Sequence, residues 1–192
     1  MQDTERRQGI RLEGITIGWN ALEAAVAITA GLAASSAALV AFGLDSVVEV
    51  TAAVVVLWQF LGIAEERERL ALKLIGASFF LLAAYVAFSS INDLVTGSEP
   101  DASTVGIVLT ALSVMVMPAL AWAKRRAGER INSRTLIADA HQTLLCVYLS
   151  ASTLLGLVAN AAFGWWWADP AAALVVAGLA LNEGREAWGG GD

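Results

Sequence analysis

Apolar runs that are long enough to cross a lipid bilayer as helices recur along the chain, separated by short polar segments. The bilayer core admits only structures that satisfy their backbone hydrogen bonds internally, and apolar runs of about 20 residues fit α-helices. We therefore predict an all-α integral membrane protein with six transmembrane helices. The expected spans are 14–34, 36–59, 70–92, 104–123, 136–160 and 168–187. The last span is the weakest, because its uninterrupted apolar stretch is short.

The composition supports this class of protein. Hydrophobic residues make up 57% of the 192 residues and charged residues 16%, and the mean hydropathy of +0.64 is too high for an ordinary soluble domain. We expect a single transmembrane domain over 1–192, with an N-terminal tail at 1–12, a helical bundle at 14–187 and a short C-terminal tail at 188–192. Cys146 is the only cysteine and can form no disulfide within the chain. Helix packing and lipid must therefore hold the fold.

The basic residues predict an orientation. All 12 Lys and Arg residues precede the first span, lie near the end of the sixth, or lie between spans two and three or spans four and five and at the ends of the spans that meet there. The connections at 33–36, 93–103 and 161–169 contain none. Because Lys and Arg concentrate in cytoplasmic segments, we expect both termini in the cytoplasm. The expected location is the bacterial inner (plasma) membrane, with the chain as a multi-pass protein.

Two carboxylates interrupt the second apolar run. Asp45 and Glu49 are four residues apart and share one helix face. An ionised carboxylate at mid-bilayer costs about 2.5–3.5 kcal/mol on insertion scales, so this face must meet a partner, a cavity or a cation. Counting outward from the turn between the first two spans, Glu23 falls level with Asp45 in a mid-depth layer. Asn20 falls level with Glu49, in a lower layer one turn nearer the cytoplasm.

The fifth span adds polar residues at the same two depths. We expect Cys146 in the mid-depth layer and Gln142 in the lower layer, with Asp139 on the same face, at the cytoplasmic mouth. His141 lies about 100° off that face and is either a ligand or a hydrogen-bonding residue facing another helix. Carboxylate, imidazole and thiolate groups can replace the water shell of a metal ion. The candidate metal-site residues are Asp45, Glu49, Glu23, Cys146, Gln142, Asn20, His141 and Asp139.

Three motifs in this order resemble the cation diffusion facilitator family. They are Asp45-x-x-x-Glu49 in the second span, Ser133–Ala140 opening the fifth and Trp167–Pro170 opening the sixth. The resemblance covers nearly the whole chain. The chain is similar in particular to the branch near the vertebrate synaptic-vesicle zinc transporters, whose second span carries an Ala-Phe-Gly-Phe-Asp pattern.

The resemblance implies a transport site built from the second and fifth helices. The family's second-helix pair matches Asp45 and Glu49, while its fifth-helix His-x-x-x-Asp pair falls on Gln142 and Cys146, so both of those ligand positions are altered. His141 and Asp139 are the alternative fifth-helix ligands, and Glu23 would compensate for the missing acid. We expect a short form that lacks the family's cytoplasmic C-terminal domain and forms a homodimer through its membrane helices.

The predicted function is the transport of a divalent transition metal, zinc first, out of the cytoplasm by alternating access and in exchange for protons. A carboxylate must lose its proton to bind a metal, so metal and protons can displace one another at the site. A thiol ligand at Cys146 favours zinc or another soft ion over magnesium. The expected partners are the metal ion, protons, membrane lipid and a second copy of the chain, with no prosthetic group and no nucleic acid.

Two other functions stay open. Trp19 and Glu23, four residues apart, suit an organic-cation/proton antiporter, which would depend on Glu23 alone and bind no metal. A non-transporting metal sensor or scaffold would bind metal without moving it. An enzyme is not expected, because the sequence has no nucleophile with a base and an orienting acid at plausible spacing and no nucleotide-binding loop.

Overall fold

The computed structural model of the chain describes residues 2–33, 37–60, 64–97 and 103–189. Six α-helices account for almost all of these residues. They are α1 (Gln2–Ala33), α2 (Ala37–Phe60), α3 (Ala64–Thr96), α4 (Thr104–Ile131), α5 (Arg134–Phe163) and α6 (Ala168–Gly189). The predicted hairpin turn at 34–36 and the end of the C-terminal tail at 190–192 lie outside the described residues.

The helices form a membrane-spanning bundle, as the sequence predicts. Among the described residues, five of the helices, α1 to α5, contain stretches long and apolar enough to cross a membrane. The chain is therefore an integral, multi-pass membrane protein. Several helices continue beyond the predicted spans: α1 includes most of the expected N-terminal tail, and α4 runs eight residues past 123 to Ile131. The polar extensions are rich in Arg, Glu and Ala, which favour helix.

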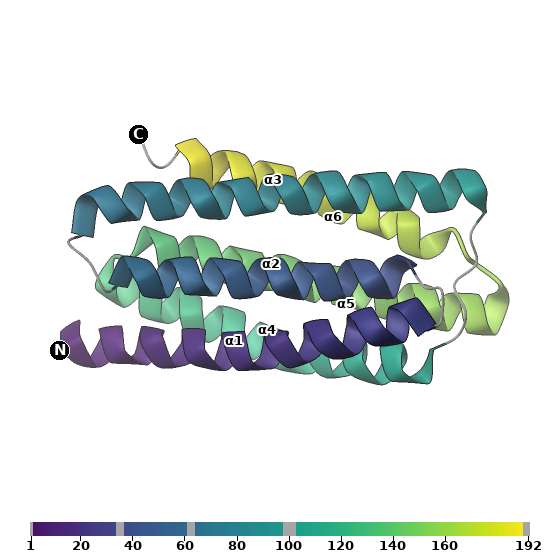
Figure 1. The fold of residues 1–192 in the computed structure, drawn as a ribbon, viewed down its shortest axis with the longest axis horizontal. Coiled ribbons are helices and arrows are strands. Elements are labelled where there is room, and N and C mark those ends of the chain that lie inside the picture. Colours follow the sequence, from purple (N-terminus) through teal and green to yellow (C-terminus); the bar gives the residue numbers. More distant parts are fainter. Residues whose placement is uncertain (1, 34–36, 61–63, 98–102, 190–192) are drawn as a thin grey trace.

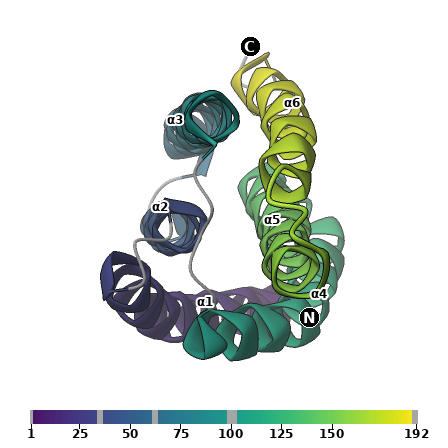
Figure 2. The ribbon, with the colours of Figure 1, turned by 90° about the vertical axis from the view of Figure 1, so that its right-hand side faces the viewer.

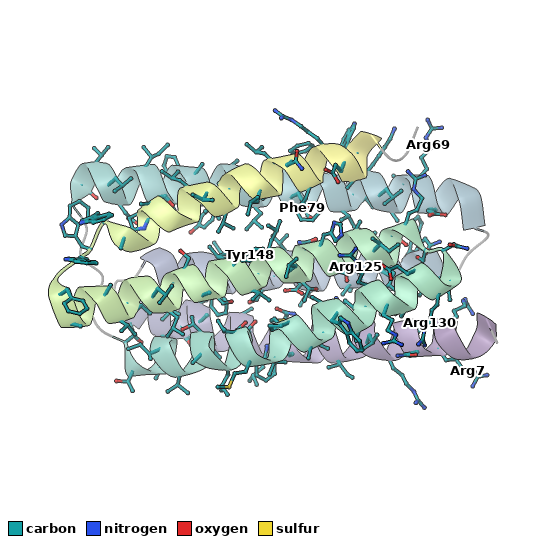
Figure 3. All side chains as sticks on the ribbon, turned by 180° about the vertical axis from the view of Figure 1, so that it is seen from behind. Arg7, Arg69, Phe79, Arg125, Arg130 and Tyr148 are labelled. Atoms are coloured by element: carbon teal, nitrogen blue, oxygen red, sulfur yellow. The ribbon has the colours of Figure 1, made fainter. Side chains whose placement is uncertain are left out.

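The six helices run along a common direction, and the described ends of the chain lie at the same end of the bundle (Figure 1). Seen end-on, α1 and α4 form one layer, α2 and α5 the next, and α3 and α6 the third (Figure 2). Arg7, Arg69 and Arg130 all lie towards the end that holds the described termini (Figure 3). We call this end of the molecule the termini end.

Glycines allow two pairs of helices to approach closely. A Cβ atom on Gly43 of α2 would lie 2.7 Å from Cγ1 and 3.0 Å from the backbone nitrogen of Ile28 on α1, and one on Gly31 would lie 2.8 Å from the backbone nitrogen of Val40. The same holds for α3 and α6, where a Cβ on Gly76 would lie 3.1 Å from the carbonyl oxygen of Gly184. Small residues at such positions let helix backbones pack against each other in membranes.

A two-residue connection joins α4 to α5. Asn132 adopts the left-handed conformation at φ 53°, and the amide of Ser133 donates to the carbonyl oxygen of Gly128 at 2.9 Å, which ends α4. A connection this short makes α4 and α5 antiparallel neighbours. It therefore places Lys124, near the end of α4, beside Asp139, near the start of α5.

Candidate cation site

A stripe of buried polar residues follows one face of α1. Glu13, Thr16, Asn20 and Glu23 are spaced three, four and three residues apart, and each side chain is at most 1% exposed. This spacing keeps them on the face that α1 turns towards α2 and α4. Polar groups of α2, α4 and α5 meet this stripe, so the interior of the bundle is polar along much of its length.

Glu23 lies where α1, α2 and α4 meet. The Trp19 indole N–H donates to Glu23 Oε1 at 3.0 Å, and the Ser46 hydroxyl lies 3.2 Å from Glu23 Oε2. Ser113 of α4 also lies within hydrogen-bonding range of this carboxylate. Glu23 is thus held by three helices, next to Asp45, as the depth comparison predicts.

Asp45 lies in the same interior but is much less well satisfied. It is 1% exposed, and neither of its carboxylate oxygens has a hydrogen bond of normal geometry to the described residues. The Cys146 thiol is within interaction range, and the carboxylates of Glu49 and Glu23 are near enough to repel it electrostatically. A buried polar group without partners is costly, so a missing partner is expected at Asp45.

Glu49 lies one turn along α2, towards the termini end. Its Oε1 accepts a 2.6 Å hydrogen bond from the Thr143 hydroxyl of α5, whereas Oε2 has no partner among the described residues. Cys146 of α5 lies near enough to interact electrostatically with both Glu49 and Asp45. Its thiol lies 3.9 Å from the Ser150 hydroxyl, one turn further along α5.

A buried ion-pair cluster continues from Glu49 towards the termini end. Lys124 Nζ lies 2.5 Å from Asp139 Oδ2 and 3.4 Å from Glu13 Oε2, and all three side chains are 0% exposed. Its ammonium also donates to the Thr143 hydroxyl at 3.2 Å. Asp139, which the sequence places at the helix start or the cytoplasmic mouth, is therefore part of an ion-pair cluster in the bundle interior, near the start of α5. Lys124 is equally buried, although the sequence places it with the connection between two spans.

Asn20 and Gln142, the two amides of the lower layer, have hydrogen bonds to other groups than the carboxylates. Asn20 Nδ2 donates to the carbonyl oxygen of Thr16 at 3.0 Å, and its Oδ1 has no described partner. Gln142 faces α3, where the Ser78 hydroxyl donates to its Oε1 at 3.3 Å. The Gln142 amide nitrogen also lacks a described partner.

His141 is directed away from the carboxylate cluster. Its Nδ1 lies 2.7 Å from Glu183 Oε2 on α6, and both side chains are partly exposed. The pair borders a cavity of about 190 Å³ between α3, α5 and α6, which Arg134 and Glu186 also line. Of the two uses that the sequence leaves open, the structure displays the hydrogen bond to a neighbouring helix.

The carboxylates and the thiol converge without forming a ready-made chelate. Within the described ranges, no group of three or more His, Cys, Asp or Glu side chains lies in a geometry that could hold a metal ion. Asp45, Glu49 and Cys146 are each at most 1% exposed, so the bundle is closed around them. Binding a cation there requires movement of the helices.

A comparison with known families identifies the bundle. The sequence model of the cation efflux transmembrane domain matches residues 15–187, which includes all of the polar interior except Glu13. The chain belongs to the cation efflux, or cation diffusion facilitator, family.

Curated members of the cation efflux family share moderate identity with the chain. The cation-efflux pump FieF of Shewanella oneidensis is 31% identical over 104 residues, 54% of this chain and 33% of its own length. Transmembrane protein 163 of Xenopus laevis is 27% identical over 154 residues, 78% of this chain and 55% of its own length. A cadmium, cobalt and zinc/H⁺-K⁺ antiporter of Bacillus subtilis is 26% identical over 118 residues, covering 61% and 37% respectively. The matches span about a third to about half of these relatives.

Several residues of this interior were not predicted from the sequence. Glu13 and Thr16 extend the Asn20–Glu23 face by two turns, so the same spacing rule would have found them. Lys124 lies seven residues from the buried Met117 and therefore shares its face of α4. Thr143 lies four residues after Asp139 and three before Cys146, so the same rule places it on their face of α5. Its contact with Glu49 depends on how α2 and α5 pack.

Proposed function

We propose that the chain exports a divalent transition-metal cation, zinc first, from the cytoplasm by alternating access and in exchange for protons. The observation that carries the proposal is Asp45, a buried carboxylate with no hydrogen-bond partner among the described residues and with the Cys146 thiol and two further carboxylates near it. Family membership supports transport of a metal cation across the membrane by this bundle.

The donor chemistry favours a transition metal as the transported ion. Carboxylate oxygens alone suit magnesium, calcium or manganese, whereas a thiolate favours zinc, cadmium and other softer ions. Cys146 lies within interaction range of both Asp45 and Glu49, so a cation held by these carboxylates would also reach sulfur. We assign the fifth-helix ligand to Cys146. His141 and Asp139 are used elsewhere, in bonds to Glu183 and Lys124.

Exchange with protons follows from the same groups. Carboxylates and thiols bind a metal only in their deprotonated forms, so loading the site releases protons and protonation releases the metal. The antiporter of Bacillus subtilis is named for the exchange of cadmium, cobalt and zinc with H⁺ and K⁺, which supports this coupling in a related bundle. The cluster of basic residues at the termini end supports a cytoplasmic location for that end.

Alternating access would begin from the closed arrangement described above. The site lies between the α1/α2 pair and the α4/α5 pair, and each pair is joined by a short connection and packs closely along its length. Rocking of one pair against the other would open the site to one side while the other side stays closed. The same motion would draw Asp45, Glu49 and Cys146 into ligating distance.

Zinc flux in proteoliposomes tests the proposal. We expect Asp45→Asn, Glu49→Gln and Cys146→Ser each to lower the zinc flux about tenfold or more, since a lost contact to a charged group is worth about 1.5–3 kcal/mol. Asp93→Asn is the matched control, because it removes a half-exposed carboxylate of α3 outside the cluster. Absence of zinc flux in the wild type, or full flux in Asp45→Asn, would overturn the proposal.

Glu23→Gln, added to these variants, separates the alternative functions. An organic-cation antiporter would move no zinc and would lose its activity only in Glu23→Gln. A metal sensor would bind zinc, detected by calorimetry, without flux in the wild type. In the structure the Trp19 indole N–H is bonded to Glu23.

A further inference from the structure

Lys124 directs all of its donors into the bundle interior. An ammonium group carries three N–H donors and no acceptor. In the structure Lys124 Nζ lies within reach of Glu13 Oε2, Asp139 Oδ2 and the Thr143 hydroxyl, from α1 and α5. The side chain is 0% exposed, so no water competes for these contacts at the surface.

The contact with Thr143 has a fixed direction. Because an ammonium can only donate, the Thr143 oxygen must accept from Lys124, at 3.2 Å. The single hydroxyl proton of Thr143 is then free to donate elsewhere. Glu49 Oε1 lies at 2.6 Å and the Asp139 carbonyl oxygen at 3.2 Å. The shorter, charge-assisted bond to Glu49 is the stronger of the two.

These contacts leave the two carboxylate oxygens of Glu49 in different environments. Its Oε1 is occupied by Thr143, while Oε2 has no partner among the described residues. The next groups in the interior are the Cys146 thiol and the carboxylate of Asp45, whose oxygens have no partner among the described residues. The carboxylate of Glu49 is therefore held by one oxygen only.

We propose that Lys124 is a positioning residue for the cation site, acting through Thr143 to hold Glu49 by Oε1 and leave Oε2 for the cation. This inference rests on the proposed function, since it concerns the same site. It assigns a function to a buried lysine that does not itself touch the transported ion. Lys124 fixes the orientation of Thr143, and Thr143 fixes the orientation of Glu49.

We call the contacts from Lys124 through Thr143 to Glu49 the relay. Zinc binding to the chain in detergent micelles, measured by isothermal titration calorimetry, tests it. Thr143→Val removes the hydroxyl at nearly constant shape and should weaken zinc binding about tenfold. Thr143→Ser keeps the hydroxyl and should stay within about twofold of the wild type. Thr153→Val is the matched control, a buried threonine of the same helix, and should bind zinc like the wild type.

Rescue by serine separates positioning from a purely structural effect. If Thr143→Val and Thr143→Ser bind zinc equally well, or if Thr153→Val loses as much affinity as Thr143→Val, the relay is wrong while the proposed function stands. If the wild type binds no zinc, the proposed function is wrong, and so is the relay, because it depends on that function. The two failures are therefore distinguishable.

The lysine is tested without leaving an unpaired buried charge. Lys124→Met combined with Glu13→Leu and Asp139→Leu replaces all three charged side chains of the cluster together, and it should weaken zinc binding about as much as Thr143→Val. Wild-type affinity in this triple variant would overturn the assignment to Lys124. If the triple variant fails to fold, the threonine variants still decide whether the relay exists.

Discussion

Replacing Lys124 by methionine should destabilise the protein strongly. The ammonium lies 2.5 Å from Asp139 and 3.4 Å from Glu13, and all three side chains are 0% exposed. Removing the cation leaves two carboxylates buried side by side without compensation. Breaking a buried ion pair in this way costs about 3–5 kcal/mol.

The same geometry predicts that a balanced replacement is tolerated. Lys124→Met combined with Glu13→Leu and Asp139→Leu replaces every charged side chain of the cluster by an apolar one, and such replacements are often neutral or stabilising by about 1–4 kcal/mol. Arg125→Met provides the control on the same helix. Its ion pair with Glu129 spans 3.0 Å between side chains that are 60% and 55% exposed, so its loss should cost about 0–1 kcal/mol.

Thermal unfolding in detergent, followed by near-ultraviolet circular dichroism, measures the contrast. At about 2–4 °C per kcal/mol for a chain of this size, Lys124→Met should lower the midpoint by roughly 6–20 °C. The triple variant should unfold at or above the wild-type temperature. If Lys124→Met unfolds no earlier than Arg125→Met, or if the triple variant is as unstable as the single one, the charge argument is refuted.

Three further predictions concern packing, protons and His141. Gly43→Ala places a Cβ 3.0 Å from the backbone of Ile28, so it should lower the free energy of unfolding by about 1–3 kcal/mol. Gly18→Ala places its Cβ where no atom lies within 4 Å, so it should stabilise α1 by about 0.5–1 kcal/mol. Lowering the pH should weaken zinc binding, because protons compete for the ligands; calorimetry showing pH-independent affinity would contradict the proposed coupling. His141→Ala should retain at least about half of the wild-type zinc flux, because the ring faces Glu183 on α6; loss of flux would restore His141 as a ligand.

The number of helices and the matching depths of Glu23 and Asp45 could be predicted from the sequence, because both depend on local geometry. Apolar run lengths report bilayer crossings, and a rise of about 1.5 Å per residue places Glu23 beside Asp45 once the two helices form a hairpin. The structure places the hydroxyl of Ser46, the neighbour of Asp45, 3.2 Å from Glu23 Oε2. Counting residues along the two helices was therefore sufficient to predict that α1 and α2 meet at this depth.

Lys124 shows where such counting fails. A basic residue near the end of an apolar run is ordinarily at the membrane surface, which is why the sequence places it in a connection. In the structure α4 continues to Ile131, and carboxylates from α1 and α5 offset the cost of burying the ammonium. That compensation comes from two other helices, the next one in the chain and the first. Nothing in the local pattern around residue 124 indicates it.

The fit of α6 against α3 has a consequence for how the protein is made. α6 is the last of the six helices in the chain, and it is not among the five whose described residues contain a stretch long and apolar enough to cross a membrane. Its Gly184 packs on Phe79 and Phe80 of α3, which offer a preformed surface already within the bilayer. We expect biosynthetic insertion of α6 to depend on that surface, so that a bulky residue at Gly184 would leave the finished chain with one helix stranded outside the membrane.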